Sequence, residues 1–162
     1  MAGELERRER AKGGMDACLG ALTCRSNVHA YQFQVVLHTV PFTNWRHVAH
    51  ALDVAASKAF PTKRKDEIKI IDVAAGTGLA GVELSKLGYT NIDALDMSQE
   101  MLNEAKKKNV YQRLICSHLS DQRTSEIDTG QYDAITCVNA LGNKHIIQNA
   151  MTELCRIVSK GK

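Results

Sequence analysis

Residues 70–84, IIDVAAGTGLAGVEL, place an acid and several glycines at a spacing that could serve ligand binding. Gly76–Gly81 fits the pattern G-x-G-x-x-G, and Asp96 follows twenty residues after Gly76. Glycines let the backbone approach a ligand closely, and an acid at this distance can accept hydrogen bonds from ribose hydroxyls. Taken alone, this spacing is compatible with more than one nucleotide-like cofactor.

Asp72 separates the candidate ligands, because it lies four positions before Gly76, where the preceding strand ends. In dinucleotide-binding folds this strand usually runs apolar up to the first glycine, since an acid there would repel a pyrophosphate. A carboxylate at this point favours a ligand that has an ammonium group and no phosphate. S-adenosyl-L-methionine, with its amine and its positively charged sulfonium, is such a ligand.

Several segments together resemble class I S-adenosylmethionine-dependent methyltransferases. DVAAGTG, residues 72–78, is similar to that family's first motif, acid-x-Gly/Ala-x-Gly-x-Gly. ALDMSQEMLNEAKKK, residues 94–108, is similar to its second motif, and QYDAITCVNAL, residues 131–141, to its fourth-strand motif. The resemblance covers about residues 45–162, and YQRL together with YDAITCVNAL more narrowly resembles the group around the methyltransferase-like protein of the Williams–Beuren syndrome chromosome region.

The resemblance implies a role for each matching position. Asp72, Ala74, Gly76 and Gly78 would line the methionyl group, Asp96 would take both ribose hydroxyls, and Met97 would pack on the adenine. His118 stands where the family often has an acid that binds the adenine amino group, and Asn139 ends the fourth strand near the methyl group. The implied cofactor-binding set is Asp72, Ala74, Gly76, Thr77, Gly78, Asp96, Met97, His118, Leu119 and Asn139.

No residue is predicted as a general base. Methyl transfer from a sulfonium is an in-line displacement that depends mainly on alignment, and an already nucleophilic acceptor needs little acid–base help. The acceptor stays unidentified, with a small molecule as the default expectation. No metal is predicted, because His47 and His50 lie one helical turn apart without a third ligand.

The elements that must position these residues alternate between helix and strand. Helices are predicted at about 45–59, 78–87, 98–108 and 145–158, and strands at 68–73, 92–95, 114–117 and 132–138. Ser98 is expected to cap the third of these helices. This order predicts an α/β, Rossmann-like open and mostly parallel sheet with helices on both faces, truncated after the fourth strand.

Residues 1–44 are expected to form an N-terminal segment of uncertain structure, followed by a partial methyltransferase domain over 45–162. Within the first segment YQFQVVLHTV alternates partly like a strand, but its flanks suggest no partner. The family's fold continues beyond a fourth strand, so the strand at 132–138 is expected to leave an unpaired apolar edge near Ile135 and Val138. Such an edge could pair with another chain, and a fragment of a longer protein is one explanation.

Composition limits the other classes of function. A net charge of +3 in 162 residues is too small to indicate nucleic-acid binding. Five cysteines without a C-x-x-C pair argue against a disulfide framework or a zinc site. The charged N-terminus and the lack of a long apolar run predict no secretory signal and no membrane span. A cytoplasmic location is expected by exclusion, with a nuclear one left open.

Two alternatives to an active methyltransferase remain. One is a non-catalytic module that binds S-adenosylmethionine or a protein partner. The other is a nicotinamide-dependent oxidoreductase, against which Asp72 and the Asp-x-Ser sequence at residues 96–98 argue. A preference for NAD over S-adenosylmethionine in a binding assay would favour the oxidoreductase.

Overall fold

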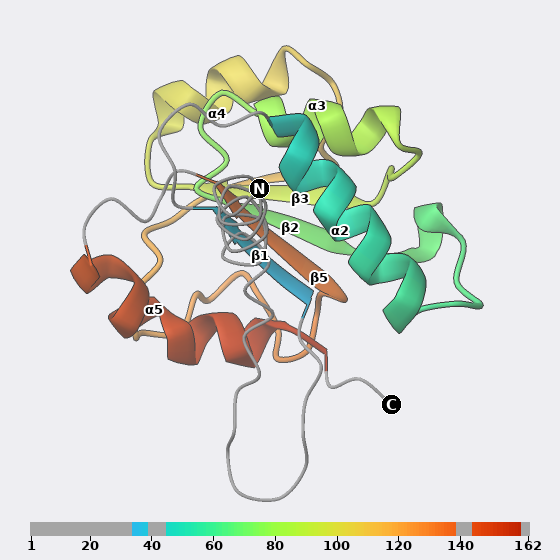
Figure 1. Cartoon of the computed structure of the whole chain (residues 1–162). Helices are drawn as coiled ribbons and strands as arrows, with labels where there is room; N and C mark the ends of the chain where they lie inside the picture. Colours follow the sequence, from blue (N-terminus) through green and yellow to red (C-terminus); the bar gives the residue numbers. More distant parts are fainter. Residues whose placement is uncertain (1–33, 39–44, 139–143, 160–162) are drawn as a thin grey trace, which may run out of the picture.

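The computed structural model describes residues 34–38, 45–138 and 144–159. Its centre is a five-stranded sheet in which every strand pair is parallel (Figure 1). In spatial order the strands are β1 (Gln34–His38), β5 (Ala134–Val138), β2 (Ile70–Val73), β3 (Ile92–Asp96) and β4 (Arg113–Cys116). The carboxyl ends of β2 and β3, which carry Asp72 and Asp96, therefore lie at the same edge of the sheet.

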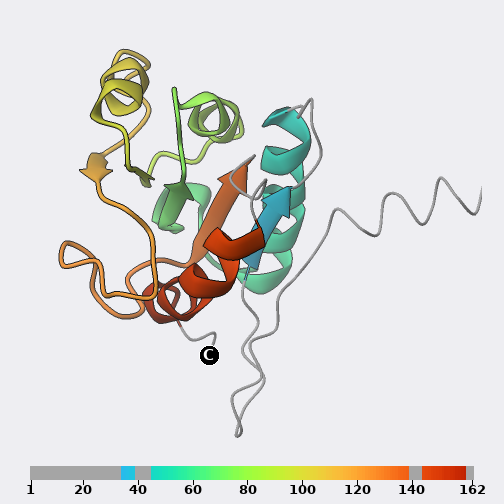
Figure 2. The same ribbon diagram turned by 90° about the vertical axis from the view of Figure 1, so that its left-hand side faces the viewer.

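Helices cover both faces of the sheet. The ribbon views place α2 (Trp45–Ala59), α3 (Leu79–Lys86) and α4 (Gln99–Lys106) on one side and α5 (Lys144–Ile157) on the other (Figure 2). A short 3-10 helix, η1 (Lys65–Glu67), precedes β2. This arrangement confirms the predicted open α/β fold of the Rossmann type.

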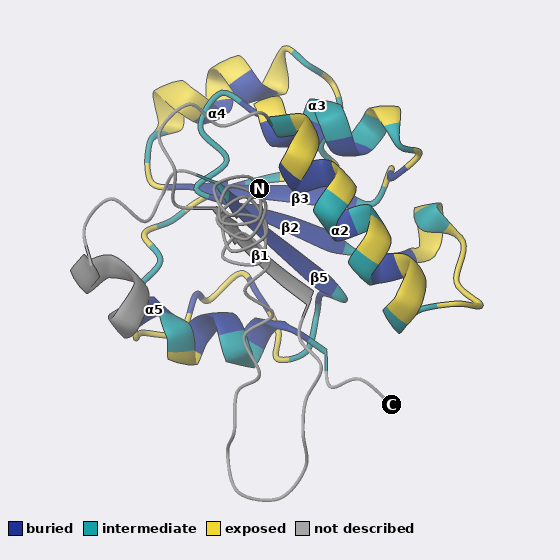
Figure 3. Cartoon of the chain, in the orientation of Figure 1, coloured by how far each residue is buried: buried dark blue, intermediate teal, exposed yellow. Residues whose placement is uncertain are grey.

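Burial of both faces explains why the central strands read as continuous apolar runs. Ile70 packs on the side of α2 and α3 with Leu52 and Leu84, whereas Ile71 packs on the opposite side with Leu154. Successive side chains of a strand point to opposite faces, so neighbouring isoleucines enter two different cores. Figure 3 shows β2, β3 and β5 buried, with the exposed residues on the outer sides of the helices.

The predicted helices are present, with ends that differ from the predicted ones by at most two residues, and the predicted Ser98 cap is confirmed. The Ser98 Oγ accepts a hydrogen bond from the Met101 N–H at 3.3 Å, which caps α4 at its first turn. Gly88 follows the end of α3 with φ of 97°, a left-handed conformation that glycine adopts without strain.

Among the described helices, none is both long enough and apolar enough to cross a membrane.

The prediction of an open edge beside β5 is wrong. β1 pairs in parallel with β5 along its whole length, from Gln34 opposite Ala134 to His38 opposite Val138. Ile135 therefore lies between two paired strands, β1 and β2. The pairing joins segments at opposite ends of the chain, so the local pattern of residues 31–40 contained no sign of a partner.

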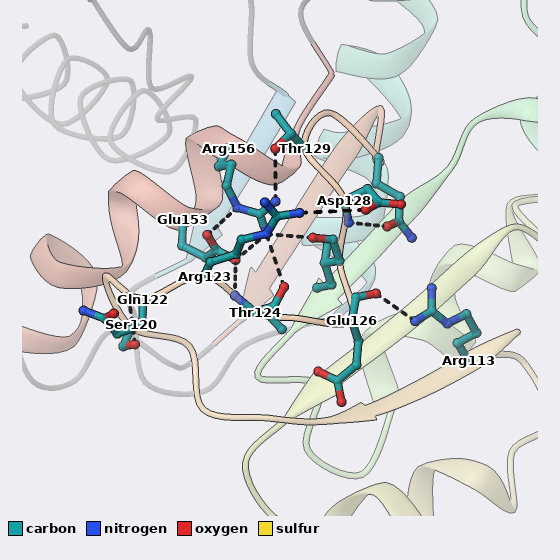
Figure 4. Close-up of polar contacts among 12 residues, drawn as sticks. Arg113, Ser120, Gln122, Arg123, Thr124, Glu126, Asp128, Thr129, Glu153 and Arg156 are labelled. Atoms are coloured by element: carbon teal, nitrogen blue, oxygen red, sulfur yellow. Dashed lines mark hydrogen bonds and ion pairs between the residues drawn. The ribbon is translucent and has the colours of Figure 1, made fainter.

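The connection between β4 and β5 is fastened to α5 by a buried carboxylate and a guanidinium (Figure 4). Glu153, only 2% exposed, accepts a hydrogen bond from the Thr124 N–H at 2.8 Å. The Arg156 Nη2 donates to Glu153 Oε1 at 2.7 Å and to the Ile127 carbonyl at 2.9 Å. This anchor holds the far part of the loop that leaves β4 through His118 and Leu119.

We expect Arg156→Met to destabilise the fold, because it removes the guanidinium and leaves the Glu153 carboxylate buried without its cationic partner. The free energy of unfolding should fall by about 3 kcal/mol, as measured by urea denaturation of the whole chain. Lys107→Met is the matched control, because it breaks an ion pair of the same i,i+3 spacing between exposed side chains. The control should change stability by less than about 0.5 kcal/mol. Equal losses in the two variants would show that the anchor is worth no more than a surface ion pair.

Candidate functional site

A cleft lies at the carboxyl edge of the sheet, beside the turn between β2 and α3. Its volume is about 250 Å³. Its walls come from β2, from the turn, from the start of α3, from the start of α2 and from the end of β5. The lining residues are Trp45, Asp72, Ala74, Ala75, Gly76, Thr77, Leu79, Ala80 and Val138. In parallel α/β sheets this edge is where ligands bind.

The turn from β2 to α3 has three residues with left-handed backbone: Ala74 (φ 54°), Gly76 (φ 56°) and Gly78 (φ 85°). Ala74 is the one of the three that has a side chain, and this conformation is strained for an alanine. A Cβ added at Gly76 would meet no atom within 4 Å, so the backbone at Gly76 faces open space. The turn therefore presents bare backbone to the cleft.

Asp72 is the most unusual group in the cleft, because its carboxyl is 1% exposed and its hydrogen-bond donors are neutral. The Tyr111 hydroxyl donates to Asp72 Oδ2 at 2.7 Å, and the Thr136 hydroxyl donates to Asp72 Oδ1 at 2.8 Å. Burial raises the pKa of Asp72 to about 6, with the nearby Asp96 carboxylate adding to the effect and the hydroxyl bonds opposing it. A cation arriving in the cleft would favour the ionised carboxylate.

Asp96 links the glycine turn to the next helix. Asp96 Oδ2 accepts a hydrogen bond from the Gly76 N–H at 2.8 Å, and Asp96 Oδ1 accepts one from the Ser98 N–H at 2.9 Å. A carboxylate has about four acceptor positions, so both oxygens keep capacity for further donors such as hydroxyls.

The structure brings together part of the predicted set. Asp72, Ala74, Gly76 and Thr77 line the cleft, Gly78 lies buried at the start of α3, and Asp96 is bonded to the turn. Met97 (72% exposed), His118 and Leu119 follow the ends of β3 and β4 outside the cleft lining, and Leu119 packs partly against the core. Asn139 lies outside the described residues.

Sequence reasoning missed three residues that contribute to the site: Trp45, Tyr111 and Thr136. The helical spacing predicts that Trp45 begins a helix, but it does not indicate that Trp45 lines the cleft. Tyr111 and Thr136 reach Asp72 from positions 39 and 64 residues away. A buried acid at a strand end signals that donors are needed, but it does not identify them.

The cleft combines an acceptor for a cation with donors for an anion. Asp72 supplies a carboxylate in a poorly solvated position. The N-cap residue of α3 is Gly78, which has no side chain to cap the helix; in the first turn the Gly81 N–H donates to the neutral Tyr111 hydroxyl, which brings no charge to the positive end of the helix. An amino acid zwitterion, with an ammonium and a carboxylate on one carbon, matches this pair of features.

Comparison with known proteins agrees with this chemistry. A family model described as a methyltransferase domain matches residues 70–161. The chain belongs to this methyltransferase family. The match includes β2, the glycine turn, Asp96 and the greater part of the described core, so most of the residues that line the cleft lie within the matched range.

Individual relatives match over about half of the chain. Methyltransferase-like protein 27 from Homo sapiens is 36% identical over 85 residues, which are 52% of this chain and 34% of that protein. The demethylmenaquinone methyltransferase of Corynebacterium efficiens is 33% identical over 93 residues, which are 57% of this chain and 38% of that enzyme. The matched part thus spans little more than a third of the length of these curated relatives.

Among solved structures, a S-adenosylmethionine-dependent methyltransferase from Clostridium acetobutylicum superposes with a TM-score of 0.58 at 20% identity. The superposition covers 74% of this chain and 48% of that one. This likeness shows that the methyltransferase domain described here has the same fold.

We expect Asp72→Asn to gain stability relative to the wild type as the pH rises from 4 to 6. The folded-state pKa of Asp72 is raised from 3.8 to about 6, so in this window the folded protein holds a proton that the unfolded chain has released. Stability of the wild type therefore falls with rising pH, whereas asparagine does not titrate. The relative gain should reach about 3 kcal/mol near pH 7, measured by denaturant unfolding across the pH range.

Asp53→Asn is the matched control, because Asp53 also accepts a hydrogen bond from a tyrosine, Tyr89, at 2.9 Å. Burial works against ionisation of Asp53 too, but the bonds from Lys65 and Tyr89 outweigh it and lower its pKa. The folded form is then ionised throughout this range and the unfolded chain completes its ionisation just above pH 4, so the control should show at most a small change between pH 4 and 6, opposite in sign to that of Asp72→Asn. A flat difference for Asp72→Asn as well would contradict the raised pKa.

Proposed function

We propose that this methyltransferase domain binds S-adenosyl-L-methionine and is part of an enzyme that transfers its methyl group to a small-molecule acceptor. The observation that carries the proposal is the buried Asp72 carboxyl in the cleft wall, which has neutral donors and room for a cationic partner. Membership of the methyltransferase family supports it independently.

The methionyl end of the cofactor fits the features of the cleft. Its ammonium would pair with Asp72, and its carboxylate would lie near the N-terminus of α3, where the N-cap residue Gly78 has no side chain. Gly76 offers backbone that no side chain covers. The zwitterion would thus be oriented by opposite charges at two ends of one turn.

The nucleoside end would extend toward the ends of β3 and β4. Asp96 keeps acceptor capacity for the ribose hydroxyls, although its two oxygens already hold Gly76 and Ser98. Met97 is 72% exposed beside it and offers an apolar surface for the adenine. His118 and Leu119 follow β4, and we assign them to the adenine side on the family's pattern.

When bound, the cofactor supplies a methyl group on a positively charged sulfur. The protein's own part is to align this group and to keep water away, for which no proton transfer is required if the acceptor is already nucleophilic. A small-molecule acceptor is supported by the relative from Corynebacterium efficiens, whose name gives demethylmenaquinone as the molecule it methylates. For this chain we propose only the class of acceptor, a small molecule.

We expect the whole chain to bind S-adenosylhomocysteine saturably in calorimetric titration and to bind NAD at least tenfold more weakly. Asp96→Ala should lower the affinity for S-adenosylhomocysteine about tenfold or more, because it removes the proposed acceptor for the ribose hydroxyls. Circular dichroism should confirm that the variant folds.

Glu104→Gln serves as the control, because Glu104 is an exposed acid on α4 whose partner is Lys107. It should bind S-adenosylhomocysteine like the wild type. Tighter binding of NAD than of S-adenosylhomocysteine would favour an oxidoreductase instead, and unchanged affinity in Asp96→Ala would remove Asp96 from the site.

A further inference from the structure

Tyr111 joins the candidate site from outside the glycine turn. It lies in the connection between α4 and β4, 39 residues beyond Asp72. The Tyr111 hydroxyl donates a hydrogen bond to Asp72 Oδ2 at 2.7 Å. The Tyr111 hydroxyl oxygen also accepts a hydrogen bond from the Gly81 N–H at 3.2 Å. One hydroxyl group therefore ties the end of β2 to the first turn of α3.

The ring of Tyr111 fills the space above two of the glycines. A Cβ on Gly78 would lie 2.8 Å from the Tyr111 Cε2, and a Cβ on Gly81 would overlap the ring and the hydroxyl. A side chain at either glycine would force Tyr111 away from Asp72. Gly76 has no such contact. Within G-x-G-x-x-G, the second and third glycines thus make room for the ring of Tyr111. The first glycine contacts no such side chain, so its backbone stays open to a ligand in the cleft.

We propose that Tyr111 is a positioning residue of the cofactor site, holding the Asp72 carboxyl and the start of α3 in the arrangement that receives the methionyl group. This inference rests on the proposed function of the cleft. It goes beyond the proposed function because it assigns the position of the Asp72 carboxyl to Tyr111, a residue outside the glycine motif that lies 39 positions beyond Asp72.

The groups that face Asp72 explain why the Tyr111 hydroxyl is important for the ionisation of the Asp72 carboxyl. Asp96 on β3 carries the same charge and opposes ionisation of Asp72, while burial raises the pKa of the Cys137 thiol on β5 to about 12 and keeps that group neutral. On the side of α3, the Gly81 amide favours the ionised carboxylate. The Tyr111 hydroxyl is the strongest of the bonds that favour ionisation, so its loss raises the pKa of Asp72 further.

The test is titration of S-adenosylhomocysteine into the full chain and into Tyr111→Phe between pH 5 and pH 8. Phenylalanine keeps the ring over the glycines and removes the hydroxyl. At pH 7 we expect about tenfold weaker binding in the variant. The pH below which affinity falls should also move upward by about one unit, because the ligand's ammonium needs an ionised Asp72.

Tyr132→Phe is the matched control. The Tyr132 hydroxyl donates to the buried Asp93 Oδ2 at 2.7 Å and accepts from the Gln131 side chain at 3.3 Å, in the other core of the protein. Loss of that hydroxyl should lower stability and leave both the affinity and its pH profile unchanged. A purely structural tyrosine would behave in this way.

Wild-type affinity and an unshifted pH profile in folded Tyr111→Phe would overturn the inference. If that variant does not fold, Thr136→Val tests the premise that the hydroxyl donors of Asp72 control its ionisation and thereby ligand binding. Unchanged affinity together with an unchanged pH profile in folded Thr136→Val would remove that premise and overturn the inference. Failure of the wild type to bind would instead refute the proposed function, and the positioning role with it. Carbon-13 titration of the Asp72 carboxyl in the ligand-free chain would then still show whether Tyr111 controls its ionisation.

Discussion

Burial of one carboxyl group at the end of a central strand governs how the site is built. A buried carboxyl without hydrogen bonds is costly, so Asp72 requires donors from whatever packs around it. Tyr111 arrives from the connection after α4 and Thr136 from the neighbouring strand β5, and the Gly81 amide in the first turn of α3 donates to the Tyr111 hydroxyl. Satisfying one acid thus holds three separate parts of the chain in register around the cleft. The donors are neutral, so the charge is positioned but not neutralised, and the cleft retains its attraction for a cation.

The same tyrosine–aspartate contact recurs elsewhere in the described part of the chain, with a different outcome. The three pairs are Tyr89 with Asp53, Tyr111 with Asp72, and Tyr132 with Asp93. Asp53 also has Lys65 at 2.6 Å, and Asp93 has the Arg113 guanidinium at 4.0 Å. Both acids therefore have a cation of the protein's own nearby. Asp72 differs because it lines the cleft and its donors are two hydroxyls, so the contact alone does not mark a ligand site. The three acids thus differ in the charges around them: Asp53 and Asp93 have a cation of the protein nearby, and Asp72 has the carboxylate of Asp96.

The three glycines of the G-x-G-x-x-G pattern are present for two different physical reasons. Gly76 leaves backbone open to the cleft, whereas Gly78 and Gly81 admit the ring of Tyr111. Two of the three glycines are thus needed for packing within the protein and not for contact with a ligand. For this reason the glycine pattern, which several nucleotide-binding folds share, does not by itself select a cofactor. Selection depends on the groups beside it: Asp72 at the strand end, which disfavours a pyrophosphate, and Asp96, whose oxygens connect the turn to α4.

Local chemistry in the sequence was sufficient to predict the alternating helices and strands from residue 45 onward, the Ser98 cap, and the placement of Asp72 and Asp96 at one edge of a parallel sheet. Those features depend on periodicity, on capping, and on the rule that parallel strands end together. The pairing of β1 with β5, the contact of Tyr111 with Asp72, and the place of Trp45 in the cleft wall were decided by the tertiary structure. Each of these joins residues far apart in the chain. Their free energy comes from burial and hydrogen bonding that exist only once the layers have packed, so no local pattern records them.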